Sequence, residues 1–351
     1  MSCPSLIPHS HPSLGEAEVQ AVADAVRSGA LAQGEQVAAF ECAMARVTGQ
    51  EQGVAVSSGT AALFLALKGL GIGAGDEIIF PSYVCAALWH TVTQVGATPV
   101  LVDIEPETYH LSPGAVTRAI TNKTKAVIVP HLFGLPADLS ELEQSGIPII
   151  EDCAQTVGVS MGGRPVGSVG DLTVCSFYAT KLLTTGEGGM VVGRSEPLMA
   201  RIRALRQYDE AEILAPAFNY KMTEMQAALG LCQVGALPHF ITRRQAIAVR
   251  YTAALRGLQT TPPMGASGRD HLYYRYVIRL PHSVESAITA FAERGIVCRR
   301  PIFKPLHRYV GLQGFPGTDV AWERALSIPI HPSLSDHDVE RIVEAMGGVL
   351  A

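Results

Sequence analysis

Residues 54–71 read VAVSSGTAALFLALKGLG and combine three local patterns in one short stretch. A β-branched run is followed by small polar residues at positions 57–60, and apolar residues then recur at helical spacing over residues 62–70. This order predicts a strand, a tight turn and a helix that begins near Gly59 and Thr60. Ser-Gly-Thr is also an ordinary helix cap, but the free N–H groups and the positive dipole end of such a helix favour a bound phosphate. The stretch therefore predicts a strand and helix with a candidate anion site at the turn.

Short apolar runs alternate with helical stretches beyond this unit. The runs are EIIF, PVLVDI, KAVIVPHLFG and PIIED, and helices are expected at residues 86–96 and 112–120. Such alternation is typical of parallel strands covered by helices. We therefore expect an α/β fold with a mainly parallel sheet, in which ligands gather at the carboxyl ends of the strands.

The pattern changes in the last third of the chain. A long basic helix is expected there, followed by a Pro- and Gly-rich break at residues 261–268, a strand-like LYYRYVIRL, a helix at residues 283–294 and a final helix after Ser335. This succession predicts a smaller C-terminal α+β domain at residues 237–351 and leaves residues 1–236 as the large domain.

The composition narrows the class of protein. A chain of 351 residues exceeds the roughly 250–300 residues at which a single core stops growing, which agrees with two domains. A net charge of -5 argues against nucleic-acid or anionic-membrane partners, because both favour a basic excess. No basic region precedes an apolar block at the N-terminus, and no apolar run approaches the roughly 20 residues of a membrane span, so we expect a soluble, cytoplasmic protein. Seven scattered cysteines without a CxxC pair suggest neither a disulfide framework nor a metal site, and we expect them to be buried.

Two further stretches supply a lysine and an acid. SFYATKLLTTGEGG at residues 176–189 places Lys181 before a glycine-rich exit, and PIIEDCAQTVG ends an apolar run at Glu151 and Asp152. A lysine amine becomes a nucleophile when its ammonium form is disfavoured, so Lys181 is a candidate to carry a Schiff base. A carboxylate at the end of a buried strand is the partner that the pyridinium nitrogen of pyridoxal phosphate requires. Taken alone, Lys181 could be an ordinary surface lysine and Asp152 an ordinary helix cap. Together with the anion site predicted within residues 54–71, these two stretches predict a pyridoxal phosphate enzyme.

The motifs of the chain also resemble those of a known family, in the same order and nearly end to end. They are SGALAQGEQVAAFE, SSGTAAL, GDEIIFPSYV, GATPVLVDI, IEDCAQTVG, SFYATK, GEGGMVV, FNYKMTEMQAALG and IPIHPSLSD. They are similar to those of the DegT/DnrJ/EryC1/StrS family of sugar aminotransferases, within the fold-type I, aspartate aminotransferase-like enzymes. The resemblance implies a fold-type I transferase that uses pyridoxal 5'-phosphate and moves an amino group from glutamate or glutamine to the keto group of a nucleotide-linked sugar. It also implies a homodimer whose active sites are shared between subunits.

The resemblance assigns roles around the cofactor. Lys181 would hold the cofactor and act as the acid and base of the reaction. Asp152 would pair with the pyridinium nitrogen, and Gln155 would bond the ring hydroxyl unless it is merely solvated. The residues that match positions around the phosphate are Gly59, Thr60 and Ser176, with a plain turn as the alternative for Ser176.

Two more positions concern the cofactor. Asn219 resembles the asparagine that reaches the phosphate of the neighbouring subunit's cofactor, and its alternative role is to cap the following helix. After PSYV the family usually carries an aromatic residue that stacks on the pyridine ring, whereas this chain has Cys85. A sulfur atom covers less area than an aromatic face, so Cys85 is expected to be a weaker cofactor contact, for which Tyr83 or another residue could compensate.

The predicted substrate contacts rest on position alone. Tyr178 could approach the substrate or pack as an ordinary aromatic residue. His307, His331 and the pair Arg299 and Arg300 match the region where the family's small domain meets the site. The arginines could hold a substrate phosphate or the donor carboxylate through forked hydrogen bonds, although each of these residues could also be structural.

Several rival functions share this fold. A related dehydratase of deoxysugars replaces the lysine by histidine, so Lys181 argues against it. A cysteine desulfurase needs a mobile reactive cysteine, and no recognisable loop carries one. An aminotransferase for a cyclitol or a small ketone is an alternative, as is a non-catalytic regulator, which Lys181, Asp152 and Gln155 together disfavour. The sequence does not specify the sugar, the nucleotide, the aminated carbon or the preferred donor.

Overall fold

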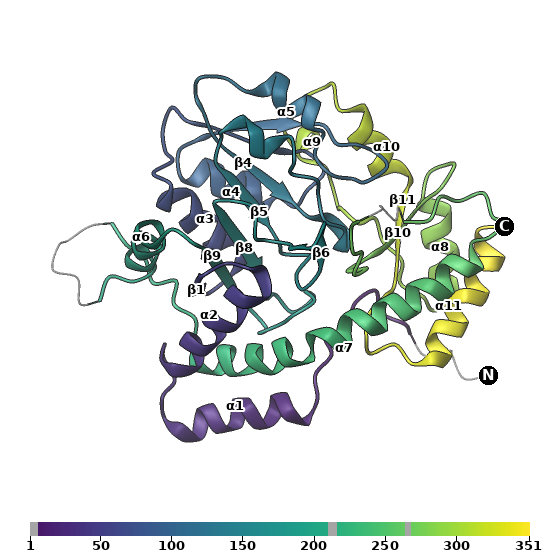
Figure 1. Ribbon diagram of the computed structural model, residues 1–351. Coiled ribbons are helices and arrows are strands. Elements are labelled where there is room, and N and C mark those ends of the chain that lie inside the picture. The colour runs from purple at the N-terminus through teal and green to yellow at the C-terminus, as the bar shows by residue number, and fades with distance from the viewer. Residues whose placement is uncertain (1–5, 210–215, 264–267) are drawn as a thin grey trace.

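A seven-stranded sheet forms the centre of the larger part of the molecule (Figure 1). The computed structural model describes residues 6–209, 216–263 and 268–351. The strands of this sheet are β1 (Gln52–Val56), β2 (Glu77–Pro81), β3 (Thr98–Val102), β4 (Thr124–Pro130), β5 (Ile149–Asp152), β8 (Leu172–Ser176) and β9 (Gly189–Gly193). Their order is β1-β9-β8-β5-β4-β2-β3, and neighbours are parallel except that β9 runs antiparallel to β1 and β8. The mainly parallel sheet predicted from the sequence is confirmed.

Both faces of the sheet are buried. Successive strand residues point to opposite sides. Ile78 and Ile128 accordingly join the apolar cluster on one face, whereas Ile79 and Val127 join a cluster on the other. This double burial explains why the strands read as continuous apolar runs rather than as alternating ones.

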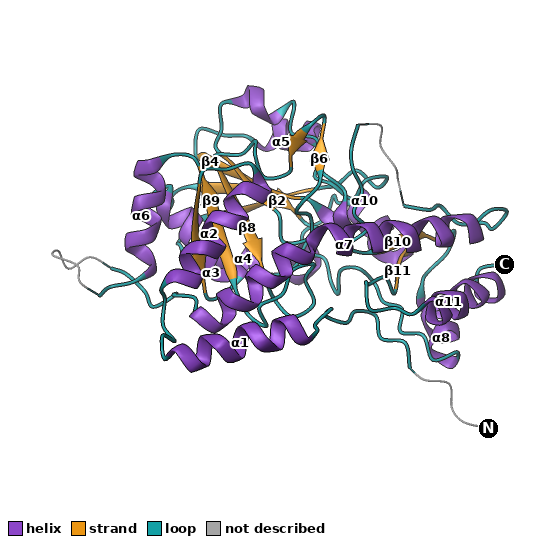
Figure 2. Ribbon diagram, turned by 60° about the horizontal axis from the view of Figure 1, so that its bottom comes forward, coloured by secondary structure: helices purple, strands orange, loops and turns teal. Residues whose placement is uncertain are grey.

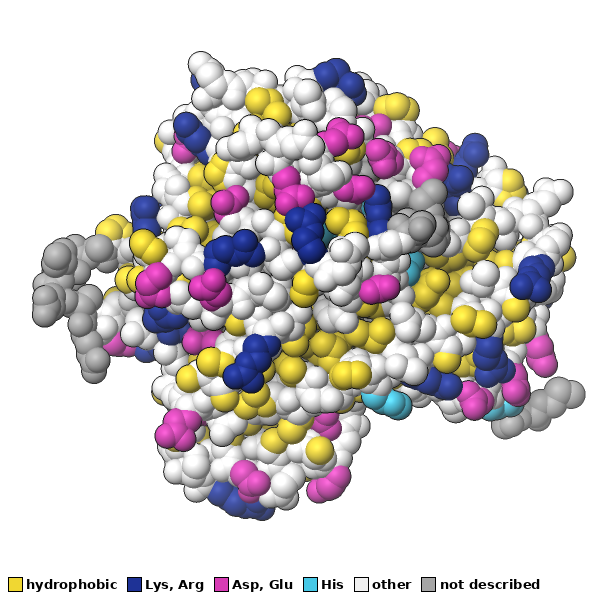
Figure 3. All heavy atoms as spheres, viewed as in Figure 1, with side chains coloured by type: hydrophobic (Ala, Val, Ile, Leu, Met, Phe, Trp, Pro, Cys, Tyr) yellow, Lys and Arg dark blue, Asp and Glu magenta, His cyan; other side chains and the backbone are white. Residues whose placement is uncertain are grey.

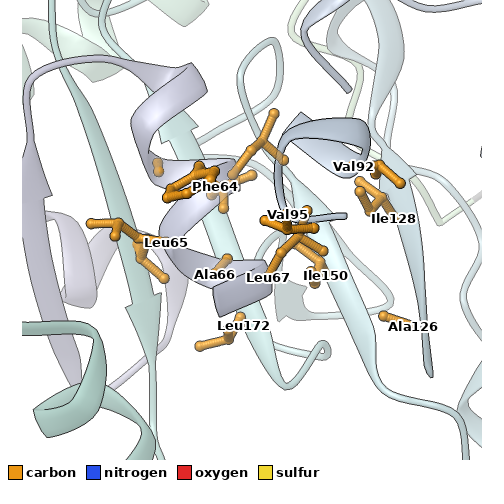
Figure 4. Close-up of a cluster of buried hydrophobic side chains, with 14 of the residues drawn as sticks. Phe64, Leu65, Ala66, Leu67, Val92, Val95, Ala126, Ile128, Ile150 and Leu172 are labelled. Atoms are coloured by element: carbon orange, nitrogen blue, oxygen red, sulfur yellow. The ribbon is translucent and has the colours of Figure 1, made fainter. Parts of the chain in front are cut away.

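Helix α3 (Gly59–Gly69) is the central element of the first face. Residues 61–67 are all buried, because α3 lies between β8 and β9 on one side and α4 (Ala87–Gln94) and α6 (Glu196–Arg206) on the other. Figure 4 shows Leu67 of α3 beside Val95 and Ile150, within the same apolar cluster. The helix predicted from the opening stretch is therefore held rigidly, with its N-terminus at the edge of the sheet.

The other face is covered by helices from several parts of the chain. They are α2 (Glu35–Thr48), α5 (Pro113–Ala119) and the start of α7 (Glu224–Ala254), with α1 (Glu16–Ser28) packed on the outside of α7. Shorter elements complete this part: the 3-10 turns η1 (Leu132–Gly134) and η2 (Leu142–Ser145), and the hairpin of β6 (Ser160–Met161) and β7 (Arg164–Pro165).

α7 extends from the sheet to a second apolar core (Figures 1 and 2). Leu237 and Phe240 pack in a cluster under the sheet, whereas Ile247 and Tyr251 belong to the second core. That core contains β10 (Tyr276–Arg279), β11 (Ala325–Ile328), α8 (Glu285–Glu293) and α11 (Asp336–Val349). α9 (Leu306–Val310) contributes Leu306 to the cluster on the sheet, and α10 (Pro316–Arg324) packs against β11. The boundary predicted after residue 236 falls inside α7, which contributes to both cores, so the division into two domains stays a prediction.

Most of the predicted helices appear within a few residues of their expected ends. Those at residues 86–96, 112–120 and 283–294 and after Ser335 correspond to α4, α5, α8 and α11. The long basic helix is an exception, because it begins at Glu224. Thr223 and Gln226 form a capping box there, and the helix continues through Pro238, next to which Leu237 is buried.

The predicted strand LYYRYVIRL pairs only over Tyr276–Arg279. Tyr273, earlier in the run, has a φ of 56°, which is incompatible with a continuous strand.

Residues 264–267 of the predicted break lie outside the described residues, as does Cys3. Among the described cysteines, Cys42 and Cys85 are exposed, contrary to the expectation of burial, whereas those buried as expected are Cys153, Cys175 and Cys298.

The face of the molecule in Figure 3 carries interspersed acidic and basic side chains, and apolar side chains gather near the centre of the view. Within the described ranges, no helix combines the length and the apolar character needed to cross a membrane.

Candidate active site

The carboxyl ends of β1 and β8 and the first residue of the antiparallel strand β9 meet at one edge of the sheet and bring the predicted residues together. Val56, Gly189 and Ser176 lie opposite one another across β1, β9 and β8. A methyl group added to Gly189 would lie 2.3 Å from the backbone oxygen of Ser58, and one added to Gly59 would lie 2.7 Å from the Cβ of Ser176. The turn after β1 is thus packed directly against the end of β8, and only glycine fits at either contact.

This turn has the features of an anion site. Ser58 caps α3, because its hydroxyl accepts a hydrogen bond from the Ala61 N–H at 3.1 Å. Within the described residues, no hydrogen bond involves the N–H groups of Gly59 and Thr60 or the hydroxyl of Ser176. Free N–H groups at the start of a helix, beside a free hydroxyl, can bind a phosphate.

Asp152 ends β5, two strands from Gly189. Its side chain is 8% exposed, and its Oδ1 accepts a hydrogen bond from the Ala154 N–H at 3.0 Å. Burial raises the pKa of this carboxyl, and the Ala154 N–H and the charge of Lys181 oppose that rise. A cationic partner at the other oxygen would favour the ionised form further.

Glu151 faces the opposite side of the sheet and has a structural role. Its carboxylate accepts hydrogen bonds from backbone N–H groups of the turn at residues 167–170 and from Nε2 of His131. Burial alone would raise the pKa of Glu151, but these hydrogen bonds hold it below its usual value. The Ala137 N–H donates to Nδ1 of His131, so both ring nitrogens are engaged. Glu151, His131 and Cys153 lie close enough together to share a metal ion, yet these bonds assign the acid and the imidazole to fixing the turn.

Lys181 lies in the loop after β8. Its backbone N–H donates to the carbonyl of Tyr178 at 2.8 Å, and its Nζ lies 5.8 Å from the centroid of the Tyr274 ring. Tyr274 is buried, and its hydroxyl donates to the Thr180 carbonyl at 3.2 Å. Tyr274 thus supports the loop that carries Lys181 and contacts the lysine side chain.

Cys85 faces the same space as Lys181 and Asp152. Cys85 as a whole is exposed, but burial raises the pKa of its thiol, because the charged thiolate is disfavoured away from water. The charge of Lys181 lowers the pKa of Cys85 and that of Asp152 raises it, so both groups are close to the sulfur. Tyr83 is fully buried and stacks on Tyr109, so Tyr83 does not supply an aromatic face to this space.

Gln155 is oriented by its backbone neighbour. The Phe133 N–H donates to Oε1 of Gln155 at 2.9 Å, and Phe133 adopts a φ of 61° to make this contact. Among the described residues, Nε2 of Gln155 has no partner. The amide is therefore available as a donor, and the bond to Phe133 argues against a freely solvated side chain.

Asn219 is exposed beside the end of β1. The neighbouring Tyr220 carbonyl accepts a hydrogen bond from the Ser57 N–H at 2.8 Å, which fixes this segment next to the phosphate-type turn. Thr223, and not Asn219, caps α7. The alternative role of Asn219 as a cap of α7 is thereby excluded, and its amide has no hydrogen-bond partner among the described residues.

Comparison with known proteins identifies the chain. A sequence model of the DegT/DnrJ/EryC1/StrS aminotransferase family matches residues 12–347. The chain belongs to this family. SpsC, a spore coat polysaccharide biosynthesis protein of Bacillus subtilis strain 168, is 34% identical over an alignment of 378 residues that covers 98% of this chain and 97% of SpsC.

Solved structures of similar proteins agree with this assignment. The aminotransferase TlmJ from Streptoalloteichus hindustanus is 33% identical, with a TM-score of 0.94 and coverage of 99% of both chains. The proposed sugar aminotransferase Spr1654 from Streptococcus pneumoniae, in its PMP form, is 30% identical, with a TM-score of 0.92 and coverage of 98% of this chain and 97% of that chain. A PLP form of Spr1654 is also known. The chain is therefore a pyridoxal phosphate-dependent aminotransferase of fold type I, in a family of sugar aminotransferases, which sets aside the non-catalytic alternative.

The residues of this family member fit pyridoxal phosphate. Among the described residues, the N–H groups of Gly59 and Thr60 are unbonded and available to the phosphate, and a methyl group at Gly59 would lie 2.9 Å from the Ser176 hydroxyl beside them. Asp152 presents a buried carboxylate with one oxygen unbonded among the described residues, and Gln155 presents a free amide. Lys181 lies close enough to Asp152 and Cys85 for its charge to change the pKa of both.

Two of the predicted substrate contacts, His307 and His331, have their side chains buried and bonded within the chain. His307 is buried, and its ring nitrogens bond to the Ser82 hydroxyl at 2.8 Å and to Asp319 at 3.3 Å. His331 is buried too, its Nε2 donates to the Pro8 carbonyl, and burial, with the charge of a nearby arginine, lowers its pKa to about 4. Both histidines therefore hold remote segments of the chain together, which the sequence alone does not reveal. Tyr178, by contrast, is 47% exposed in the loop of Lys181, so it is accessible to a substrate.

A large basic cavity lies next to the lysine loop. Its volume is about 1020 Å³, and Thr180 of that loop lines it together with the predicted Arg299 and Arg300. The other basic residues of its lining are His9, Arg275, Lys304 and Arg308. Sequence reasoning missed Arg275 and His9, as well as Tyr274. The run LYYRYVIRL predicted only a strand, and no local signal relates His9 to residues that lie far along the chain.

Proposed function

We propose that this aminotransferase moves the amino group of glutamate or glutamine to the keto group of a nucleotide-linked sugar. The observation that carries the proposal is the basic cavity beside Thr180. A volume of about 1020 Å³ exceeds what an amino acid requires, and arginine side chains are suited to forked hydrogen bonds with phosphate oxygens. A sugar joined to a nucleoside diphosphate combines the size and the negative charge that such a cavity favours.

The residues of the site would divide the chemical work. When bound, pyridoxal phosphate supplies the electron sink that lets an amino group pass from donor to acceptor. Lys181 would hold the cofactor through Nζ, and the same amine would take up and return the proton of the substrate carbon. Asp152 would keep the ring nitrogen protonated, and Gln155 would donate from Nε2 to the ring oxygen. The N–H groups of the turn at residues 58–60 would hold the phosphate, together with the Ser176 hydroxyl.

We further propose that the active unit is a homodimer. Asn219 is exposed, is not used as a helix cap and lies next to the phosphate-type turn. Val19 and Val26 of α1 and Leu31 are exposed apolar side chains that a second copy would cover, and the Leu31 carbonyl accepts a hydrogen bond from the Glu224 N–H at the start of α7, five residues after Asn219. Asn219 would then complete the phosphate site of the partner subunit.

A half-reaction screen tests the acceptor. The enzyme is first aminated with glutamate, the donor is removed, and a panel of nucleotide-linked keto sugars is added while the absorbance of the lysine-bound cofactor is followed. We expect the absorbance to return with at least one member of the panel and not with the same sugar lacking its nucleotide. Return only with a cyclitol or a small ketone would contradict the proposed acceptor and support the alternative class of substrate.

A further inference from the structure

A second cavity lies beside helix α10, outside the candidate active site. Its volume is about 700 Å³, which is within the usual range for sites that bind small molecules. It is formed by residues 258–261, by residues 279–281 at the end of β10 and by one side of α10, together with Pro106. Among the described residues that line it, none belongs to the candidate active site. The aminotransferase reaction therefore leaves this cavity without a role.

Main-chain pairing brings two arginines to the second cavity. Arg279 lies opposite Ala325 in the pairing of β10 with β11, so the preceding residue, Arg324, lies close to it. The Leu280 N–H also donates to the Arg324 carbonyl at 2.9 Å. Thr261 forms two backbone hydrogen bonds of 2.9 Å with Arg279, which fixes residues 258–261 beside the strand. Both arginines line the cavity, although they lie far apart in the sequence.

The charge of the second cavity is positive. Its described lining residues include Arg279 and Arg324 and no acidic residue. Within the part of the chain that the structure describes, the Arg324 side chain forms no ion pair or hydrogen bond. Nη1 of Arg279 donates to the Pro106 carbonyl at 3.2 Å and lies 3.9 Å from an oxygen of Glu107, whose exposed carboxylate contributes little at that distance. Both guanidinium groups are therefore available to an anion.

A buried hydroxyl and apolar side chains complete the lining. Thr260 lines the cavity, and its Oγ1 is buried without a hydrogen-bond partner among the described residues. Buried hydroxyl groups normally have a partner, so this one is suited to bond a ligand. The apolar residues of the lining are Pro106, Leu258, Leu280, Pro281, Pro316 and Val320. Two guanidinium groups, each able to form forked hydrogen bonds, beside apolar walls suit a small molecule that joins a phosphate to an apolar or ring-shaped body.

Helix α10 separates the second cavity from the basic cavity. Val320 and Arg324 are four positions apart, so they share one face of α10, and both line the second cavity. Trp322 is midway between them in the sequence and lies on the opposite face, where it lines the basic cavity. The guanidinium carbons of Arg300 and Arg308 lie 4.3 and 4.1 Å from the centroid of the Trp322 ring. A ligand in the second cavity would thus contact the helix that supports these arginines without entering the active site.

We propose that the second cavity is a binding site for a small phosphate-bearing molecule, held by Arg279 and Arg324. The Thr260 hydroxyl supplies a further hydrogen bond, and the apolar walls cover the body of the ligand. The site is separate from the active site, so the inference does not depend on the identity of the amino donor or the acceptor.

The test measures the binding of inorganic pyrophosphate to the holoenzyme by calorimetry. Arg324→Gln is the main variant, because Arg324 is exposed and its replacement should leave the fold intact. Arg256→Gln is the matched control: it removes the same charge, and Arg256 is exposed but lines neither cavity. Arg299→Gln, in the basic cavity, identifies any pyrophosphate that binds at the active site instead. Arg279→Gln provides a second variant of the proposed site.

We expect Arg324→Gln and Arg279→Gln each to weaken the binding of pyrophosphate at one site by about tenfold or more, since a forked charge-assisted pair is lost. Arg256→Gln and Arg299→Gln should keep the binding at that site at the wild-type affinity. The inference is overturned if Arg324→Gln and Arg279→Gln bind pyrophosphate as the wild type does, or if Arg256→Gln shows an equal loss. It is overturned as well if Arg299→Gln abolishes all binding, or if the wild type binds no pyrophosphate.

Discussion

The replacement Glu151→Gln tests how the acid-bearing strand is supported. In the wild type, Oε2 of Glu151 accepts from Nε2 of His131 at 2.9 Å and from the Gly167 N–H at 3.0 Å, while Oε1 accepts from two further N–H groups. An amide can replace only one of these oxygens as an acceptor, so two buried donors would face an NH₂ group. His131 cannot relieve this by moving its proton, because Nδ1 already accepts from Ala137.

Each unsatisfied buried donor costs about 1–3 kcal/mol, so we expect Glu151→Gln to lower the free energy of unfolding by about 2–6 kcal/mol. Urea denaturation of the apoprotein, followed by circular dichroism, measures this loss. The control is Glu143→Gln, because Glu143 forms an exposed pair with Arg164 and its loss should cost less than about 1 kcal/mol. A loss below about 1 kcal/mol for Glu151→Gln as well would refute the reasoning.

The same carboxylate predicts a dependence on pH. The hydrogen bonds hold the folded pKa of Glu151 below its ordinary value of 4.5, so the unfolded chain binds its proton first as the pH falls. The stabilisation is therefore fully present above about pH 4.5 and is lost as the pH falls through the lower folded pKa. In that acid range the stability of Glu151→Gln should change less with pH than that of the wild type, and equal slopes would contradict this account.

Three other substitutions probe the cofactor site. Asp152→Asn removes the charge that would keep the cofactor ring protonated. We expect the affinity for the cofactor, measured by equilibrium dialysis, to fall by about tenfold or more, and turnover in a steady-state assay to fall further. Wild-type affinity and turnover in this variant would contradict the role of Asp152. Gly59→Ala would put a methyl group 2.7 Å from the Cβ of Ser176 and would disturb the turn that is proposed to hold the phosphate. Equilibrium dialysis should therefore show weaker binding of pyridoxal 5'-phosphate and little change in the binding of pyridoxal. An equal loss of affinity for both ligands would argue against a phosphate site at this turn. Cys85→Phe should bind the cofactor about two- to tenfold more tightly, because an aromatic face covers more of the ring than a sulfur atom does. Unchanged affinity in the same assay would place residue 85 away from the ring.

The sequence predicted the positions in the fold of those candidate residues that depend on local order. Asp152 ends an apolar run and Gly59 follows another, and both therefore lie at the carboxyl edge of a parallel sheet. The rule that ligands gather at this edge needs only the strands and their direction, which hydrophobic patterns reveal. The match to family motifs then extended the prediction to Gln155 and Asn219.

The residues that sequence reasoning missed, and the two buried histidines, depend on contacts between distant parts of the chain. His307 is occupied by Ser82 and His331 by Pro8, and neither contact has a sequence signal. Arg275 reaches the site because its backbone bonds to Phe133, and His9 reaches it because residues 7 and 295–297 pair alongside each other. Such pairings follow from the tertiary fold and not from local propensity, so the basic cavity could not be outlined in advance.

The central claim is a covalent bond between Nζ of Lys181 and pyridoxal phosphate. Reduction of the holoenzyme with borohydride would make this bond permanent, and peptide mapping by mass spectrometry would locate it. We predict that the label lies on Lys181 and is absent from a folded Lys181→Ala variant, which should also fail to transfer amino groups. A label on another lysine of the wild type, or appreciable transamination by Lys181→Ala, would contradict the account.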